Sequence, residues 1–205
     1  MLRRLLLPIL LAAMTMTAQA RTAADFFLGA PDSAFGIFSH NTRLDMLDYF
    51  NYGKDTPSRN ILGGSSRITA NNPSLLSVKV SDIASMDLAV IPLKRDTVLA
   101  VIETVATPVP DSHITLYDSS WQALNVQPPR LTTTDFVSAS DRRKAAGTEL
   151  PPFPFYTITF RPEDGAFRFV NTTGGYYDKA DSPDGLSLMK SELWMKFDGK
   201  KWKQL

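Results

Sequence analysis

The chain has 205 residues, with 22 lysines and arginines against 21 aspartates and glutamates, two histidines and no cysteine. This near-neutral charge argues against a nucleic-acid-binding surface and against the basic patch of a membrane-surface binder. The lack of cysteine excludes thiol nucleophiles, cysteine-ligated zinc and disulfide bonds.

The N-terminal residues predict a Sec-type signal peptide. Two arginines precede an apolar run from Leu5 to Met16, and Ala18-Gln19-Ala20 forms a small-residue cleavage box. The run is about a dozen residues long, too short for a bilayer span of roughly 20. We expect cleavage between Ala20 and Arg21, which leaves a mature chain without a transmembrane segment in the periplasm or outside the cell. Arg21 stands where a lipoprotein would need cysteine.

Two short helices are predicted next. Thr22 to Asp25 has the spacing of a capping box and precedes a short apolar segment. Asn41 is suited to cap a second helix, which Gly53 would end at the C′ position. The apolar residues of this second helix recur every three positions and form one stripe, so both helices are expected to cover a sheet.

The chain then changes to the period-two alternation of β-strands. A proline-rich segment, 125–152, interrupts it, and within this segment Asp135 to Ala146 is predicted to be helical. The predicted strands before the segment are 76–80, 86–90, 97–107 and 114–118, and those after it are 155–160, 166–170, 186–189 and 192–197, with a turn at Asp198-Gly199 into 200–205.

These elements predict an α+β fold. We expect a predominantly antiparallel β-sheet of about eight strands, with two N-terminal helices and one mid-chain helix packed on it. Residues 1–20 are the signal peptide. Residues 21–205 form one domain, or two subdomains, 21–124 and 153–205, joined by segment 125–152. The pattern leaves open whether the strands make one sheet or two.

The residues that could carry catalysis are few. His113 follows Asp111 and Ser112, and Asp118 is close in sequence, which suggests a hydrolase set. Neighbouring strand residues point to opposite faces, so Ser112 should point away from Asp111 and His113. We therefore interpret His113 as an exposed strand-end residue.

A metal site is also not expected. The segment from Asp181 to Asp184 and Gly185 faintly resembles a calcium loop, but it lacks the third acidic position and the closing glutamate of an EF-hand. We interpret it as a polar turn, and we expect no catalytic residue, no metal and no cofactor.

Aromatic residues gather in the C-terminal third. Tyr176, Tyr177, Trp194 and Trp202 are candidate ligand-binding residues, and Trp194 and Trp202 would form a flat platform for a sugar or a peptide if they turned outward. Trp194 and Lys196 should share one face of a strand. The alternative, which we prefer, is that these rings pack in the core or at its edge.

Four stretches, 41–50, 74–86, 114–121 and 193–202, resemble an uncharacterised family of secreted proteins from Bacteroidetes of the gut and mouth. That family has no assigned activity, so the resemblance implies no functional residues. It does imply export, and exported proteins of this phylum are often O-glycosylated at Asp-Ser/Thr followed by a small or aliphatic residue. Ser33 and Thr97 fit this pattern.

The expected function is therefore non-enzymatic binding. We expect an exported envelope or secreted protein that binds an unknown envelope protein or glycan through a sheet face or edge. The alternative is a carbohydrate-binding module that uses the four C-terminal aromatics. A hydrolase built on His113 is the third hypothesis.

Overall fold

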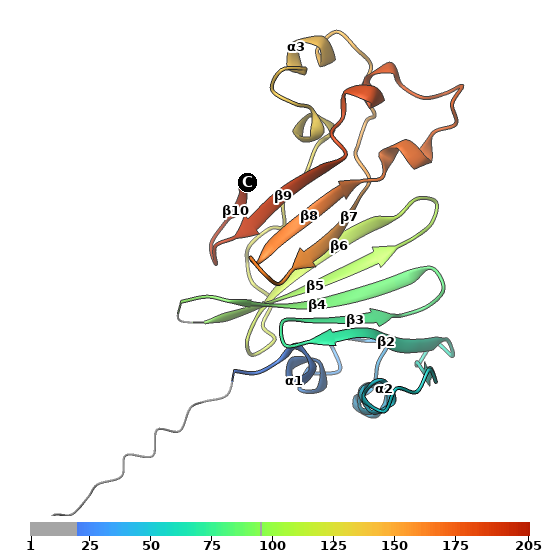
Figure 1. The fold of residues 1–205 in the computed structure, drawn as a ribbon, viewed down its shortest axis with the longest axis vertical. Coiled ribbons are helices and arrows are strands. Elements are labelled where there is room, and N and C mark those ends of the chain that lie inside the picture. Colours follow the sequence, from blue (N-terminus) through green and yellow to red (C-terminus); the bar gives the residue numbers. More distant parts are fainter. Residues whose placement is uncertain (1–19, 95) are drawn as a thin grey trace, which may run out of the picture.

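The computed structural model describes residues 20–94 and 96–205 (Figure 1). The predicted signal peptide lies outside the described residues except for Ala20, which is exposed, so the predicted cleavage is not tested. The Arg21 guanidinium donates to the Ser119 carbonyl at 3.4 Å and lies over the Phe26 ring. Within the described ranges, no helix is long and apolar enough to cross a membrane.

The two N-terminal helices are present, with one boundary moved. Helix α1 (Ala23–Leu28) begins with the predicted capping box between Thr22 and Asp25, which is confirmed. Thr22 donates through its backbone and its hydroxyl to the Asp25 carboxylate, and this lowers the pKa of Asp25. Helix α2 (His40–Asn51) begins earlier than predicted because the Ser39 hydroxyl, and not the Asn41 side chain, accepts a free backbone N–H of the first turn, that of Thr42.

The first sheet is antiparallel and each strand pairs with its neighbour in sequence. The structure confirms four predicted strands here and adds two at the N-terminal edge. The strand over 65–72 was not predicted, because Ser66 and Ile68 are its only buried residues and its register with the next strand shifts between Ile68 and Ala70. The strands are β1 (Ser58–Arg59), β2 (Ser65–Asn72), β3 (Leu75–Lys79), β4 (Ala84–Pro92), β5 (Thr97–Val105) and β6 (Asp111–Asp118).

The second sheet contains four antiparallel strands in the order β10-β9-β8-β7. Gly165 and Gly199 have positive φ at its two tight turns, where a side chain would be strained. The predicted strand 186–189 is wrong, because that segment forms the 3₁₀ helix η3 (Asp184–Leu188). The strands are β7 (Tyr156–Arg161), β8 (Ala166–Asn171), β9 (Glu192–Phe197) and β10 (Trp202–Gln204).

The mid-chain helix is shorter than predicted. Segment 135–146 holds the end of a 3₁₀ helix, η1 (Thr133–Phe136), and one turn of α-helix, α3 (Arg142–Ala145). Ser138 breaks the predicted helix because its hydroxyl accepts from the Asp141 backbone N–H at 3.2 Å, which forms a turn instead. A further 3₁₀ helix, η2 (Thr173–Tyr176), follows β8.

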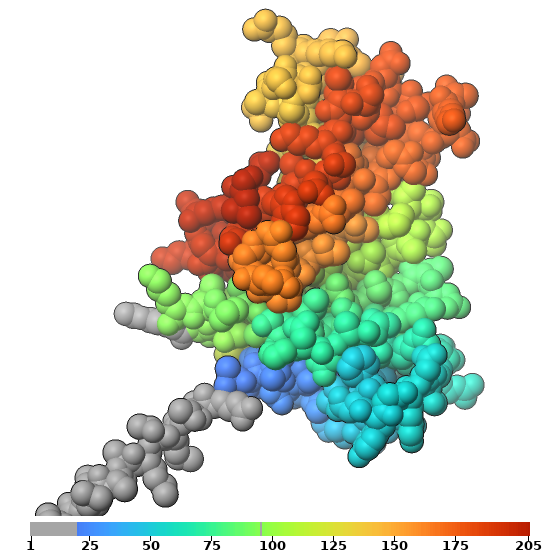
Figure 2. All heavy atoms as spheres, in the orientation of Figure 1, coloured from blue at the N-terminus to red at the C-terminus, as the bar shows by residue number. Residues whose placement is uncertain are grey.

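The described residues form two hydrophobic cores on opposite faces of the first sheet. Helices α1 and α2 cover one face, and the second sheet packs on the other. Strands β4 and β5 contribute to both cores, with Leu88 and Val90 on the helix side and Ala89 and Ile91 on the other. Figure 2 shows the helices, in blue and cyan, at one end of the molecule and the yellow mid-chain segment at the other. The α+β fold is confirmed, with two sheets.

Candidate functional site

The two sheets meet at β6 and β7, which lie side by side (Figure 1). Each is the last strand of its own sheet, and no β-bridge joins the two strands among the described residues. Two side chains of β6 form the connection. The backbone N–H of Ile158 donates to the Ser112 hydroxyl at 3.0 Å, and that of Tyr156 donates to the Asp111 carboxylate at 3.2 Å.

A cleft of about 420 Å³ runs along β6 beside this connection. Its floor is apolar, because Ile114, Leu116 and Ile158 are buried there. Its rim carries exposed polar side chains from β6 and from the segment that follows it. The other lining residues are Ser112, His113, Thr115, Leu124, Val126, Gln127, Pro128, Pro129, Arg130 and Tyr156.

The hydrolase residues are not brought together in this cleft. Ser112 is buried and its hydroxyl lies 2.7 Å from that of Thr104, whereas His113 is exposed. The Asp111 carboxylate accepts from β7, and the Asp118 carboxylate accepts from two backbone N–H groups in the following turn. The Ser112 hydroxyl and the Asp111 and Asp118 carboxylates are therefore already used in structural hydrogen bonds, to a neighbouring strand or to the backbone of a turn.

Tyr156 is the titratable cleft residue whose pKa is shifted. Burial raises the pKa of its phenol, and the nearby Asp111 carboxylate raises it further. Its ring packs against Phe136 and Phe169. The phenol therefore stays protonated at neutral pH and can donate a hydrogen bond at the cleft wall.

Trp194 and Trp202 lie on opposite faces of the second sheet. Trp202 packs on the inner face, with its ring centroid 5.0 Å from that of Phe167. Trp194 lies on the outer face, with the Arg161 guanidinium 4.1 Å from its ring centroid, and its indole N–H donates to Glu192. The two tryptophans therefore cannot share a binding platform.

Tyr176 and Tyr177 lie elsewhere, at the end of η2. Their rings are 5.3 Å apart at 84°, so they are not coplanar either. Tyr176 packs instead against Phe155, which contacts Phe153. Phe153 and Tyr176 are 53 % and 49 % exposed. Ligand binding by these two tyrosines stays a prediction.

The remaining predicted sites fall on surface turns. Ser33 is exposed and Thr97 is half-buried at the start of β5, so both O-glycosylation sites stay predictions. Asp181 precedes η3 and Asp184 begins it. Among residues 20–94 and 96–205, no three acidic or histidine side chains are grouped to hold a metal.

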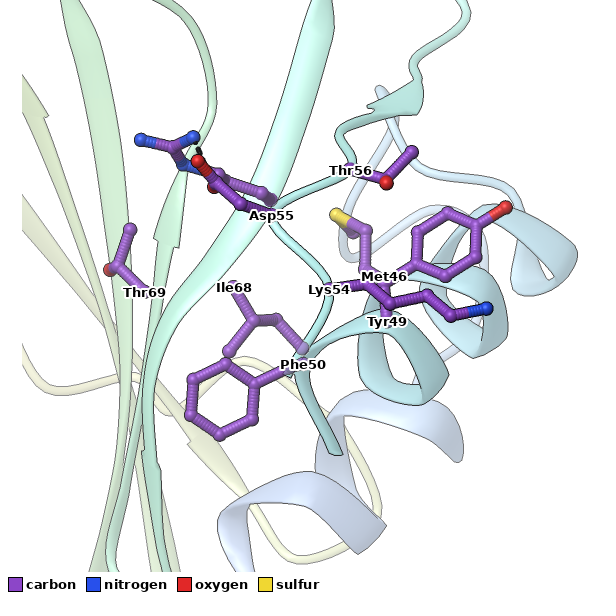
Figure 3. A pocket seen from close by; sticks show the side chains of 9 residues that line it. Met46, Tyr49, Phe50, Lys54, Asp55, Thr56, Ile68 and Thr69 are labelled. Carbon is purple, nitrogen blue, oxygen red and sulfur yellow. Dashed lines mark hydrogen bonds and ion pairs between the residues drawn. The ribbon is translucent and has the colours of Figure 1, made fainter. Parts of the chain in front are cut away.

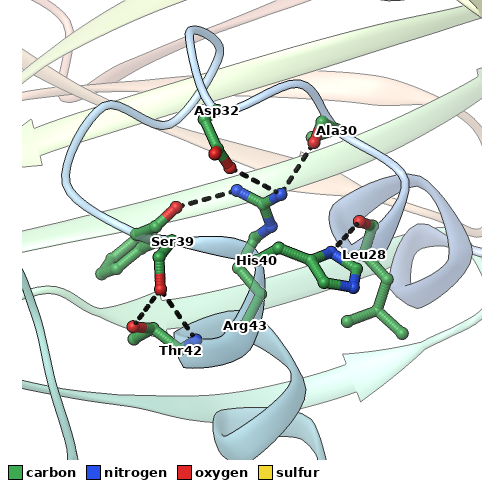
Figure 4. A network of polar contacts seen from close by, with 8 residues as sticks. Leu28, Ala30, Asp32, Ser39, His40, Thr42 and Arg43 are labelled. Atoms are coloured by element: carbon green, nitrogen blue, oxygen red, sulfur yellow. Dashed lines mark hydrogen bonds and ion pairs between the residues drawn. The ribbon is translucent and has the colours of Figure 1, made fainter.

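A buried arginine was missed by sequence reasoning (Figure 4). The Arg43 side chain is 1 % exposed and donates to the carbonyls of Phe38 at 2.8 Å and Ala30 at 2.7 Å. It also reaches the Asp32 carboxylate at 3.3 Å. Arg43 is three and seven positions from Met46 and Phe50, so it falls on the apolar face of α2, and this spacing could have revealed it.

Comparison with known proteins gives a family and a fold. The family model described as "Protein of unknown function (DUF3256)" matches residues 15–202. A solved structure titled "Structure of a domain of an uncharacterized protein from Porphyromonas gingivalis W83" is similar, with a TM-score of 0.69 and 18% identity over 91% of this chain and 99% of that chain. A comparison with curated proteins finds no match.

Proposed function

The chain belongs to the DUF3256 family of proteins of unknown function. We propose that it is an exported, non-enzymatic binding protein that takes an extended segment of an envelope protein along the edge of β6. The export part rests on the signal-peptide pattern of the sequence. The binding part rests on one observation, the cleft between two terminal strands that are joined by side chains and not by a ladder.

Terminal strands favour this kind of ligand. The edge of a sheet offers a row of backbone N–H and C=O groups, and an extended peptide binds there by adding a strand. In this protein residues 122–124 already pair with the Leu116–Asp118 end of that edge, so a bound segment would pair at Ser112–Ile114. There the edge faces the cleft, and the segment would also bury its side chains. Ile114 and Leu116 offer it an apolar floor, and Pro128 and Pro129 supply a rigid wall.

The polar groups of the cleft support binding over catalysis. Ser112 is the buried hydroxyl there, and it accepts from the Ile158 N–H while it contacts the Thr104 hydroxyl. Proton abstraction by His113 would need both side chains on one face of β6, but the strand places them on opposite faces. Arg130 and His113 are exposed at the rim and are suited to select among bound segments.

In-cell photo-cross-linking tests the proposal. A photoreactive residue replaces Thr115, which is half-buried in the cleft, and a matched variant carries it at Thr159, which is exposed on β7. We expect one dominant protein adduct from position 115 and none from position 159. Equal labelling at both positions, or none at either, would contradict binding at the edge of β6.

A further inference from the structure

Three connecting segments of the first sheet lie side by side at one end of its strands. The Asn60 amide donates to the Val80 carbonyl at 3.5 Å, which joins the first segment to the second. The Ala106 N–H donates to the Ile83 carbonyl at 2.8 Å, which joins the second to the third. In the antiparallel sheet these segments share an end, at the right of Figure 1. They are residues 60–64 between β1 and β2, 80–83 between β3 and β4, and 105–110 from the last residue of β5 to β6.

Two segments beside the second sheet extend this surface. Segment 172–177, which contains η2, meets the β5–β6 turn because the Thr172 hydroxyl donates to the Pro110 carbonyl at 2.6 Å. Segment 151–155 lies next to it, because the Thr172 N–H donates to the Phe155 carbonyl at 2.9 Å. A chain of hydrogen bonds therefore links all five segments, which we call the turn surface.

The turn surface is apolar and exposed. Six of the nine large apolar or aromatic side chains that are exposed in residues 20–94 and 96–205 belong to it. Ile61 and Leu62, at the tip of the β1–β2 turn, are 64 % and 79 % exposed. Single exposed apolar side chains are ordinary, whereas a concentration of them at one end of a molecule marks an interaction surface. The other four side chains are Ile83, Val105, Phe153 and Tyr176.

The turn surface is also almost free of charge. Asp82 is the one charged residue in the sequence of its five segments, although 21% of the chain is charged. The Asp82 carboxylate accepts from the Lys79 ammonium group at 2.8 Å, so this charge is paired. The five segments contain no lysine and no arginine. Attraction between opposite charges therefore contributes little to what binds here.

Two other parts of the molecule differ in composition. Figure 3 shows a hollow between α2 and β2 that is lined by Lys54 and Asp55, and its apolar floor residues, Met46 and Ile68, are buried. The turns at the opposite end of the second sheet are charged as well, because 162–165 and 198–201 hold Glu163, Asp164, Asp198, Lys200 and Lys201. Exposed apolar side chains without charge distinguish the turn surface from both.

We propose that the turn surface docks on a lipid bilayer, with its exposed apolar side chains inserted into the bilayer interface. These side chains lie on separate segments, and a fluid surface admits each of them without a matching shape. Binding to a bilayer scales with the buried apolar area plus the attraction to anionic lipids, and only the area term applies here. Tyr176 suits the position, since tyrosine collects at membrane–water interfaces. This docking is independent of segment binding at β6.

Vesicle flotation of the mature chain tests the proposal. We expect similar binding to vesicles of phosphatidylcholine and to vesicles of phosphatidylcholine with phosphatidylglycerol, at low and at high salt, because screening weakens only charge attraction. Leu62→Asn should weaken binding about tenfold, since burial of a leucine side chain contributes at least that factor. Leu205→Asn is the matched control, because Leu205 is 65 % exposed and lies outside the turn surface, and it should bind as the wild type does.

Several results would overturn the proposal. These are no flotation with either vesicle, binding to anionic vesicles alone that salt abolishes, or unchanged binding in Leu62→Asn and Ile83→Asn. An equal loss in Leu62→Asn and Leu205→Asn, in variants that retain the wild-type circular dichroism spectrum, would do so as well. Sedimentation without lipid tests a second copy of the chain as the occupant. A dimer that Leu62→Asn dissociates would assign the turn surface to self-association and exclude the lipid proposal.

Discussion

Replacing Arg43 with methionine should destabilise the protein strongly, because the guanidinium holds the loop between α1 and α2. Methionine keeps the apolar stem but leaves the buried carbonyls of Phe38 and Ala30 without their charged donor. A hydrogen bond to a charged group contributes about 1.5–3 kcal/mol, so the loss of two is about 3–6 kcal/mol. For a chain of this size, that corresponds to a fall in Tm of about 6–24 °C.

The assay is urea unfolding of the mature chain, with thermal unfolding as a second measure. Asp32→Asn is the matched control, because it removes only the contact between Arg43 and a carboxylate that is 75 % exposed. It should cost less than about 1 kcal/mol. The reasoning is refuted if Arg43→Met unfolds within about 1 kcal/mol of the wild type, or if the Asp32 variant is equally destabilised.

Three further predictions concern the sheets. Ser112→Ala should lower the unfolding free energy by about 1–3 kcal/mol and speed hydrogen exchange at Ile158, and unchanged exchange would contradict the bridging role. The Arg161 side chain lowers the pKa of Asp164 from 3.8 to about 2, so this carboxylate adds stability above pH 4 that is lost as the pH falls through 2. Urea unfolding between those pH values should show a smaller loss for Asp164→Asn than for the wild type. Burial raises the pKa of Asp87, which disfavours its charged form in the folded protein, so Asp87→Asn should raise the urea midpoint at pH 7 but not at pH 3.

The elements that could be predicted are those with a clear local signal. Strands β3 and β6 alternate apolar and polar residues, β5 is a run of apolar and β-branched residues, and the capping box at Thr22 is a four-residue pattern. Strand β2 lacked that signal, because Ile68 is its one buried apolar side chain and a bulge follows it. The predicted helix from Asp135 failed because the Ser138 hydroxyl competes for the backbone at that point.

The candidate site could be predicted only in part. The sequence indicated a sheet edge but not which one, because the meeting of Ser112 with Ile158 depends on contacts between residues far apart in the chain. One local signal was present. Ser112 shares a strand face with the buried Ile114 and Leu116, and a hydroxyl on an apolar face needs a partner. The ring positions of Trp194 and Trp202 depend on the register of β9 with β10, which the sequence pattern does not set.

The two-sided burial of β4 and β5 has a consequence for how the chain is made. One face of the first sheet, which contains Ala89, Ile91 and Ile102, is buried by the second sheet. The last strand of that second sheet ends at Gln204. During synthesis from the N-terminus, that face gains its first cover from the segment around Phe136 and from β7, and the cover is complete only when β9 and β10 are available. We expect the growing chain to depend on chaperones in this interval, since exposed apolar strands aggregate. The first sheet therefore depends on residues after 124 to bury its second face.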